Sequence, residues 1–457
     1  MSGWRSTNLG NLGTLVRGIS FPKEARGTEP KKGFIACLRT TNVQKEVDWD
    51  DLVFVPEQYL RDDEKLIRAG DILISNANSL ELVGKSSYVA QVPVRATLGT
   101  FISAFRCDDS VDSKFVYFQL CAPDVRSAIR NVASTTTNIS NVSGEKLGNV
   151  ELRVPSLPEQ RRIVAKIEEL FTQVDAGVQA LERAKVLLKQ YRQSLLKSAF
   201  SGKLTEKWRQ ENRDKIEPAS VLLERIREER KKKLGKKYKE LPPLDTSDLP
   251  ELPEGWAWVR LQDVASKVTD GEHFRPKTID SGVLFLSAKD VTDSGIDLSD
   301  PLFMDPTDAV RSRLRCDPER GDILVVSRGA GIGRSCIVNI DKTFCLLGSV
   351  ILIKPVDMVL NRLILLMLKS PFLNRRLTSL SGSTAQQAIY LRDITVLPLP
   401  LPPIEEQHQL VQTVDDLLSK VDYVEHSIEH LESLSHQGRQ SVLNQAFSGA
   451  LLQSEIS

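Results

Sequence analysis

The two halves of this chain of 457 residues close with the same succession of motifs. A segment ending in Gln160 leads into a stretch with helical periodicity and then into Ala-Phe-Ser-Gly, which starts at Ala199. The second half repeats this order from Gln407 to Ala446. In both copies 39 positions separate the glutamine from the alanine. Because a helix rises about 1.5 Å per residue, the sequence predicts two spacer helices of equal length, about 60 Å each.

Further matches extend the repeat. Within the helical stretches no insertion is needed to align Val164 with Val411, Leu170 with Leu417, Val174-Asp175 with Val421-Asp422, and Arg192-Gln193-Ser194 with Arg439-Gln440-Ser441. Upstream, Gly70-Asp71-Ile72-Leu73 is answered by Gly321-Asp322-Ile323-Leu324, and Gly3-Trp4 corresponds to Gly255-Trp256. The repeated unit is therefore a whole domain with its helix, which is too long for a solenoid repeat.

Length and composition favour two globular domains over a single core. Hydrophobic residues make up 41% of the chain, and no apolar run is long enough to cross a bilayer. The N-terminus lacks the charged-then-apolar pattern of a secretion signal, which predicts a cytoplasmic location. The six cysteines include no CxxC pair, so neither a zinc site nor a disulfide framework is indicated.

Charge is distributed unevenly. The formal net charge is only +1, yet the segment from Arg225 to Lys239 holds nine basic and two acidic residues. A solvated helical linker is one interpretation of this segment. Contact with phosphate or with an acidic partner is the other.

Both long stretches carry an apolar stripe at heptad spacing. The two stripes comprise Ile163, Ile167, Leu170, Val174, Leu181, Leu188 and Leu195 in the first stretch, and Leu410, Val414, Leu417, Val421, Val424, Ile428 and Leu431 in the second. An apolar stripe needs a cover, and each helix can cover the other. The linker would allow either direction, but we expect an antiparallel coiled coil because it gives the repeated halves a two-fold relation.

The predicted fold is α+β, with two similar α/β domains separated by the two long helices in a pseudo-two-fold internal repeat. The predicted divisions are a first domain (1–154), a first spacer helix (155–204), a charged linker (205–250), a second domain (251–402), and a second spacer helix with the C-terminus (403–457).

Local composition predicts the elements within each domain. In the first domain we expect strands at 34–38, 72–75, 88–92, 100–106 and 150–154, and a helix at 115–130. In the second we expect strands at 283–286, 323–327, 336–340, 350–353 and 396–401, and a helix formed by 362–368 with 372–380. Polar loops are expected at 133–141 and 381–387, and a linker helix at 219–233.

Three segments resemble catalytic or ligand sites in part. The run Gly329 to Gly333 follows a predicted strand, but another strand is expected after it, which favours a glycine-rich hairpin over a nucleotide site. His426 and His430 stand one helical turn apart without an evident third metal ligand. The run ending in His273 (Asp-Gly-Glu-His) offers acid–base groups, but the first domain has no counterpart. With no nucleophile, methyl-transfer or nuclease motif, the sequence does not indicate an enzyme.

The chain resembles the DNA-specificity subunits of type I restriction–modification systems. The residues that carry the resemblance are LPEQ at 157–160 with AFSGKLTEKWR at 199–209, PIEEQ at 403–407 with AFSGAL at 446–451, LPEGW at 252–256, and the two GDIL strands. It covers nearly the whole chain and is most specific in the helices. The first domain begins Ser2-Gly3-Trp4 without the full LPEGW preamble, and no basic tail follows Leu451.

The resemblance implies a division of labour. Each globular domain would be a target-recognition domain that reads one half of a bipartite, asymmetric site in double-stranded DNA. The helices would set the spacing and dock two modification (methyltransferase) subunits, and two restriction subunits would complete the complex. This chain would be non-catalytic and bind no cofactor, with S-adenosylmethionine, ATP and Mg on the partner subunits.

Candidate DNA contacts are polar or basic residues in loops that recur in both halves. In the first domain they are Arg39, Thr40, Asn42, Lys85, Thr136, Thr137 and Asn138. In the second they are Lys289, Arg328, Arg334, Ser383, Gln386 and Gln387. Arginine can form two hydrogen bonds with guanine, and asparagine or glutamine two with adenine.

Two other classes of protein stay open at this point. A structural scaffold would join two ligand-binding domains without affinity for DNA. A fused homodimeric enzyme would carry its active site at the Gly329 loop or at His273.

Overall fold

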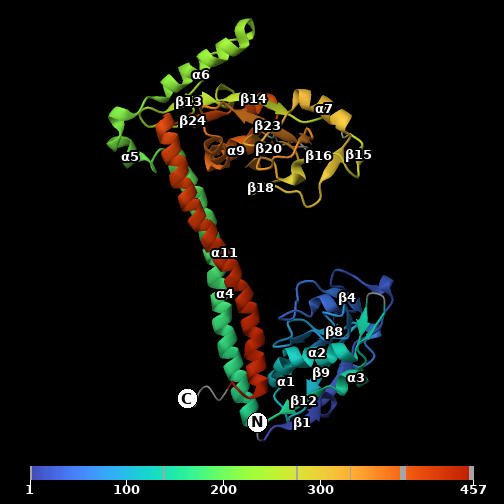
Figure 1. The fold of residues 1–457 in the computed structure, drawn as a ribbon. Helices are drawn as coiled ribbons and strands as arrows, with labels where there is room; N and C mark the ends of the chain where they lie inside the picture. Colours follow the sequence, from blue (N-terminus) through green and yellow to red (C-terminus); the bar gives the residue numbers. More distant parts are fainter. Residues whose placement is uncertain (1–2, 137–138, 274–275, 330, 381–386, 452–457) are drawn as a thin grey trace. The chain divides into compact units, whose positions relative to one another are not determined.

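The computed structural model divides into two compact units, Met1–Arg183 with Ile428–Ser457, and Ala184–Ser427. The structure describes residues 3–136, 139–273, 276–329, 331–380 and 387–451. Each unit combines one globular domain with segments of two long helices, α4 (Leu157–Phe200) and α11 (Ile404–Ser448), labelled in Figure 1. The helices contain 44 and 45 residues, so the prediction of equal lengths is confirmed to within one residue.

The first unit is built on small, mostly antiparallel sheets. One contains β2 (Gly13–Arg17), β9 (Ile102–Cys107), β5 (Ile72–Ser75) and β7 (Ser86–Tyr88), and another contains β4 (Val53–Pro56), β3 (Phe34–Leu38) and β8 (Ala96–Leu98). Strand β1 (Arg5–Asn8) pairs with β12 (Glu151–Val154), which leads into α4. The helices are α1 (Ser113–Cys121), α2 (Pro123–Val132) and α3 (Gly144–Gly148). Only the pair β3–β8 is parallel among these strands.

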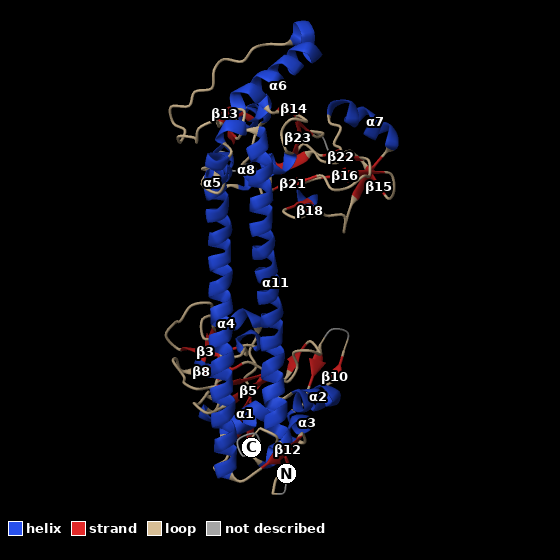
Figure 2. Ribbon diagram, turned by 60° about the vertical axis from the view of Figure 1, so that its left-hand side comes forward, coloured by secondary structure: helices blue, strands red, loops and turns tan. Residues whose placement is uncertain are grey.

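The second unit repeats this strand order. Its sheets contain β14 (Ala265–Asp270), β23 (Val350–Pro355), β20 (Ile323–Val326) and β21 (Ser335–Ile337), and β15 (Thr278–Ile279), β19 (Leu302–Met304), β16 (Val283–Leu286) and β22 (Phe344–Leu346). Again one pair, β16–β22, is parallel. Strand β13 (Ala257–Arg260) pairs with β24 (Pro398–Leu401). The helices of this domain are α7 (Pro306–Arg315), α8 (Asn361–Lys369), α9 (Pro371–Leu380) and α10 (Leu391–Thr395). Figure 2 distinguishes helices from strands in both units.

Several predicted elements have the expected bounds, but two predictions were wrong: the strand expected at 88–92 is β7, which ends at Tyr88, and the helix expected at 115–130 is divided. The strands at 34–38, 72–75 and 283–286 are confirmed. The single helix expected at 115–130 is two helices, because Ala122 is extended in front of Pro123. A residue before proline is disfavoured in the helical region, and proline itself suits the first turn of a new helix. The same break occurs at Ser370, before Pro371.

The glutamine that ends each repeated motif joins the long helix to its domain. Gln160 is buried; its amide donates to the carbonyl of Pro155 at 3.0 Å and accepts from the backbone N–H of Asp112 at 2.8 Å. Gln407 is also buried and donates to the carbonyl of Pro402 at 3.1 Å. Its Oε1 accepts from the N–H of the residue before α8 at 3.4 Å. A buried amide with both ends bonded fixes how the helix leaves the sheet, which explains why the motif recurs.

Each domain's first tryptophan bonds the glutamate of the same motif. Trp4 donates to Glu159 at 3.0 Å, and Trp256 donates to Glu406 at 2.8 Å. Glu406 is fully buried and also accepts from Arg209 at 2.5 Å. The correspondence of Gly3-Trp4 with Gly255-Trp256 therefore reflects a shared contact with the start of the long helix.

The aspartate of each Gly-Asp-Ile-Leu strand has the same two partners. Asp71 accepts from the backbone N–H of Arg68 at 2.8 Å and pairs with Arg106 of β9 at 2.9 Å. Asp322 accepts from Glu319 N–H at 2.8 Å and pairs with Lys354 of β23 at 3.0 Å. The motif thus closes the turn before a central strand and ties it to the neighbouring strand.

Long-helix segments contact one another within each unit. In the first unit Leu443 and Phe447 of α11 lie in one core with Ile163 and Ile167 of α4. In the second unit Leu195 and Ala199 of α4 lie in one core with Leu410 and Val414 of α11. The end of each helix therefore packs against the globular domain that precedes the other helix.

The predicted stripe on α11 was wrong at two positions. Val424 and Leu431 are exposed, at 41% and 47%, whereas Leu418 is buried. On this helix the packed side chains near the middle are Val421 and Ile428. A helix has 3.6 residues per turn and not 3.5, so a stripe read at strict heptads drifts off the packed face.

Candidate nucleic-acid interface

In the first unit a short turn after β3 carries three of the candidates. Asn42 is buried, and its side-chain amide donates to the carbonyls of Asp48 at 3.0 Å and Asp51 at 2.9 Å. Its Oδ1 accepts from the N–H of Arg39 at 2.7 Å, and the Arg39 guanidinium pairs with Asp51 at 2.5 Å. Thr40 is half-buried beside them. Arg39 and Asn42 therefore stabilise their own loop, a role that the sequence pattern does not distinguish from base reading.

Lys85 stands directly before β7 and reaches the segment that follows this turn. Its ammonium lies 2.5 Å from Oε1 of Gln44. Partial burial and the nearby Arg126 guanidinium lower the pKa of Lys85 below its ordinary value. An anion would relieve the repulsion between the two cations, so this position suits a phosphate or the acceptor edge of guanine.

The polar loop of the first domain forms a hairpin and not an irregular loop. Strands β10 (Ser134–Thr135) and β11 (Ser140–Asn141) pair with each other, and β11 also pairs with β6 (Ala77–Asn78), just beyond the end of β5. Thr136 is exposed. Thr137 and Asn138 lie outside the described residues.

The second unit places its candidates on the equivalent segments. Lys289 lies in the turn after β16 and pairs with Asp300 at 2.7 Å. Arg334 stands directly before β21 and donates to the carbonyl of Val291 at 3.3 Å. Arg328, just beyond β20, forms a β-bridge with Ala388. Gln387 is exposed, whereas Ser383 and Gln386 lie outside the described residues.

The two domains thus bring the same segments together. Lys85 and Arg334 occupy equivalent positions, and each contacts the segment after the equivalent turn. The pairing of Ala77 with Asn141 in one domain matches the bridge of Arg328 with Ala388 in the other. In each domain the turn after the parallel strand contacts a residue of the hairpin at one end of the central sheet.

The glycine-rich run from Gly329 to Gly333 connects β20 to β21 in the second domain. Strand β20 pairs antiparallel with β21, which starts at Ser335, so the predicted hairpin is confirmed. Gly329, Gly331 and Gly333 have positive φ angles of 88°, 98° and 82°, which only glycine adopts without strain. A tight turn between strands, and not a helix N-terminus, follows β20, so the geometry does not provide a dinucleotide-binding loop.

Comparison with known proteins identifies the repeated domain. The family described as type I restriction modification DNA specificity domain matches residues 1–183 and again residues 253–433. The chain belongs to this family. Its specificity domain occurs twice, once in each half.

Related proteins span most of the chain. The specificity subunit of the type I restriction enzyme EcoKI from Escherichia coli K12 is 24% identical over 459 residues, covering 98% of this chain and 89% of that protein. The EcoBI specificity subunit of E. coli is 28% identical over 348 residues, covering 75% and 67%.

Solved structures share the fold. The HsdS subunit from Thermoanaerobacter tengcongensis has a TM-score of 0.55 at 18% identity, covering 98% of this chain and 97% of that one. A structure from work on complex assembly and conformational transition of the type I R-M system has a TM-score of 0.63 at 18% identity, covering 98% and 99%.

The first specificity domain has further basic residues that the sequence analysis did not select. Arg126 and Arg130 lie one turn apart on α2, and the Nε atom of each is buried without a hydrogen-bond partner among the described residues. Burial, with Arg130 nearby, lowers the pKa of Arg126. Lys146 donates to Ser134 of the polar hairpin at 3.0 Å. The i, i+4 spacing of the two arginines in a predicted helix was the available signal.

The second specificity domain contains a three-residue cluster without a counterpart among the described residues of the first. Arg315, at the end of α7, donates to Asp270 and lies 3.0 Å from Nε2 of His273. Asp270 and His273 are 3.5 Å apart. No sequence pattern links Arg315 to His273, because the two residues are 42 positions apart. Since Arg315 holds Asp270 in an ion pair, the geometry favours a binding cluster over acid–base chemistry.

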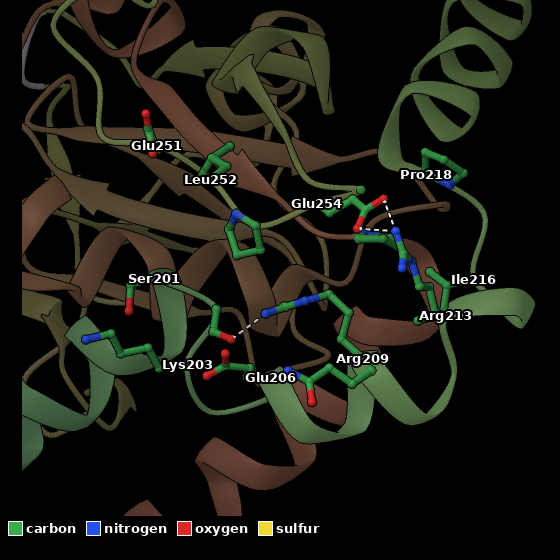
Figure 3. Close-up of a pocket in the computed structure, with 15 residues that line it drawn as sticks. Ser201, Lys203, Glu206, Arg209, Arg213, Ile216, Pro218, Glu251, Leu252 and Glu254 are labelled. Atoms are coloured by element: carbon green, nitrogen blue, oxygen red, sulfur yellow. Dashed lines mark hydrogen bonds and ion pairs between the residues drawn. The ribbon is translucent and has the colours of Figure 1, made fainter.

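The second unit also contains a polar pocket of about 690 Å³ at the end of α4, shown in Figure 3. Arg209 bridges it, donating to the carbonyl of Gly202 at 2.9 Å, while Arg213 pairs with Glu254 at 2.9 Å. The charged residues that line it are Lys203, Arg209, Arg213, Glu206, Glu251 and Glu254. Because the two signs balance, the pocket does not favour an anionic ligand, and its contacts join the linker to the second specificity domain.

Other ligand chemistry finds little support in the described part of the chain. No group of three or more His, Cys, Asp or Glu side chains there is placed to hold a metal ion. His426 and His430 are exposed on α11. All six cysteines are free thiols. Among the described residues, no helix is both long and apolar enough to span a bilayer.

Proposed function

We propose that this chain is the DNA-reading specificity subunit of a type I restriction–modification complex, with each domain recognising one half of a bipartite, asymmetric site. The observation that carries the proposal is that two copies of one framework present different side chains at equivalent positions. Lys85 in the first domain corresponds to Arg334 in the second, and the loops beside them differ as well. Since base recognition depends on the side chains that reach the groove edges, unequal loops imply unequal half-sites.

The candidate contacts fall into two kinds. Arg328, Arg334 and Gln387 have the side chains that pair with guanine or adenine through two hydrogen bonds. Lys85 can also hydrogen-bond to guanine. Lys289 and the arginines of α2 suit phosphate contacts, which position a protein on the duplex without reading its sequence. The predicted boundaries after residues 154, 204, 250 and 402, which separate the domains, the spacer helices and the linker, are also part of this proposal.

The long helices would form an antiparallel coiled coil that relates the two halves by a pseudo-two-fold axis. In support, Arg192 pairs with Asp422 at 2.6 Å and Arg439 pairs with Asp175. In the sequence repeat Arg192 corresponds to Arg439, and Asp175 to Asp422. Such a spacer would hold the two domains over half-sites about one helical turn of DNA apart.

The same helices would dock two modification subunits. In the second unit Leu187 and Tyr191 of α4 are 63% and 48% exposed, and Tyr423 of α11 is 76% exposed. Apolar side chains gathered on exposed helix faces suit a protein partner. S-adenosylmethionine, ATP, Mg and all catalysis would reside on the modification subunits and on two restriction subunits. A cytoplasmic location belongs to the same proposal, since the complex would act on DNA inside the cell.

The test is methylome sequencing of a methylation-free host that expresses this chain with its cognate modification subunit. We expect one new asymmetric, gapped motif with methylated adenines. Exchanging residues 1–154 for the first domain of a relative should change only one half of that motif. If a soluble complex forms and no motif appears, DNA recognition is wrong and a structural scaffold becomes the better account. Nucleotide or metal binding by the isolated chain would instead favour an enzyme.

A further inference from the structure

The positive charge of the chain is concentrated in one helix of the linker and the residues after it. Helix α6 (Ala219–Leu234) is followed by a 3-10 turn (Gly235–Lys237). The segment from Arg225 to Lys239 has a net charge of +7, because nine of its residues are basic and two are acidic. The whole chain has a net charge of +1, so the rest of it has a net charge of −6. A surplus of this size in 15 residues creates a strong local field.

Helix α6 is fastened to the second specificity domain. Ala219, Leu222 and Ile226 are buried in the core of that unit. The guanidinium of Arg230 donates to the carbonyls of Gln262 at 2.8 Å and Ala265 at 2.7 Å. The helix from Ala219 to Arg230 is therefore held against the domain and is not a loose linker, and its C-terminal end projects from the domain (Figure 1).

The acidic residues of α6 neutralise only its earlier turns. Arg227 pairs with Glu224 at 2.6 Å, and Lys231 pairs with Glu228 at 3.1 Å. The lysines that follow form no ion pair within the described residues; they are Lys232, Lys233, Lys236 and Lys239. The helix dipole stabilises cations in the last turn, but this effect does not extend to lysines beyond the helix end.

The position of α6 separates it from the candidate base-reading loops. Arg230 contacts Ala265, the first residue of β14. The segments bearing Arg328 and Arg334 lie at the other end of the same sheet, where β14 ends at Asp270. The turn that bears Lys289 lies beside them, because Arg334 donates to the carbonyl of Val291. Six strand residues span about 20 Å, so α6 does not face the bases read by these loops.

We infer that the lysines at the end of α6 contact the phosphates of duplex DNA outside the half-site read by the second domain. This inference rests on the proposed function. Lysine is a flexible point charge that suits phosphate oxygens, and the lysines of α6 lie away from the candidate base-reading loops. A duplex offers about one charge per 1.7 Å of its axis, so a row of lysines finds partners whatever the sequence. An acidic surface of a partner subunit is the competing occupant.

The experiment compares the complex of this chain and its modification subunit with the variant Lys232→Ser, Lys233→Ser, Lys236→Ser and Lys239→Ser. Binding is measured over a range of salt concentrations to two duplexes, one extended by about two helical turns on each side of the methylated motif and one ending at it. On the extended duplex we expect the magnitude of the slope of log K against log[salt] to fall by up to about 3.6, at about 0.9 for each of the four lost contacts. On the short duplex the slopes of variant and parent should agree. The matched control replaces the same residues by arginine and should keep the parent slope.

Four outcomes distinguish failure of this inference from failure of the proposed function. An unchanged slope on the extended duplex would overturn the inference. Loss of complex assembly in the serine variant, with the arginine variant intact, would assign the surface to an acidic protein partner and also overturn it. A methylated motif that persists in the variant leaves the proposed function standing, whereas absence of any motif in the parent complex would contradict the proposed function itself.

Discussion

Arg192 donates to the carboxylate of Asp422 at 2.6 Å, and the residues that match them in the sequence repeat, Arg439 and Asp175, also form an ion pair. Each arginine therefore pairs with the aspartate of the other repeat copy. Reciprocal contacts of this kind are what the proposed two-fold relation between the halves predicts. The same arginine and aspartate therefore occur in both copies of the repeat because they form an ion pair with each other.

Exchanging both charges of one ion pair should be tolerated better than reversing only one of them. We expect Arg192→Asp to lower the free energy of unfolding by about 1 kcal/mol or more, because it puts like charges beside Asp422 and Glu425, and Asp422→Arg in the same chain to recover part of that loss. The measurement is chemical unfolding of the full chain as a double-mutant cycle. Additive effects of the two substitutions would contradict a direct pair.

The buried glutamine at the start of α11 should be needed for stability. Gln407→Leu keeps the volume but leaves the carbonyl of Pro402 and the N–H of Leu360 without their partner. We expect a loss of about 2 to 3 kcal/mol, the cost of buried unsatisfied groups. The control is Gln412→Leu, which changes an exposed glutamine of the same helix. Equal unfolding midpoints for the two variants would show that the bonds of Gln407 contribute little.

Removing Arg209 should be more damaging than removing its neighbour Lys207. Arg209 partners the fully buried carboxylate of Glu406, whereas the Lys207 side chain is 90% exposed. Truncating one member of a buried pair leaves an uncompensated charge, at a cost of about 3 kcal/mol or more. We expect Arg209→Ala to lower the unfolding midpoint of the full chain markedly and Lys207→Ala to leave it within error. Equal midpoints for Arg209→Ala and the parent would be inconsistent with this account.

Substitutions at equivalent positions should alter different half-sites. We expect Lys85→Ala to weaken or relax recognition of one half of the methylated motif, and Arg334→Ala to do so for the other half. Loss of a good base contact corresponds to about 1 to 3 kcal/mol, or roughly 5- to 150-fold in discrimination. Methylome sequencing and binding to duplexes altered in one half-site give the readout. Lys342→Ala, on an exposed loop at the opposite end of the sheet, serves as the control. An effect of either variant on both halves alike would argue against separate readers.

Alkaline pH should destabilise the fold through the buried thiols. Burial raises the pKa of Cys37 to about 12 and of Cys336 to about 11, from 9.0. Above pH 9 the unfolded chain loses these protons while the folded chain keeps them, so the contribution to stability is complete below pH 9 and is lost as the pH rises. We expect Cys37→Ala to reduce the pH dependence of unfolding between pH 9 and 10.5 by up to about 1.4 kcal/mol per pH unit. Parallel pH profiles for variant and parent would contradict the assignment.

Sequence patterns predicted best where the physical cause is local. The lengths of α4 and α11 follow from periodicity and from prolines and glycines at their ends, and strands such as β5 follow from short β-branched runs. The break at Ala122 was missed although its cause is also local, because the apolar pattern continues across it. The sequence predicted which loops carry the candidate DNA contacts. It did not distinguish residues that stabilise the loop from residues available to bind DNA.

What the sequence alone determined is the plan of the chain: two copies of one domain, two helices of equal length, and a basic segment between them. Tertiary structure decided which side chains meet. It showed that Asn42 stabilises its own turn, that Arg315 reaches His273, and that α6 is held by Arg230 against the second domain. The reason is physical: helix period and turn chemistry act over a few residues, whereas these contacts join residues brought together only when the sheets and helices pack.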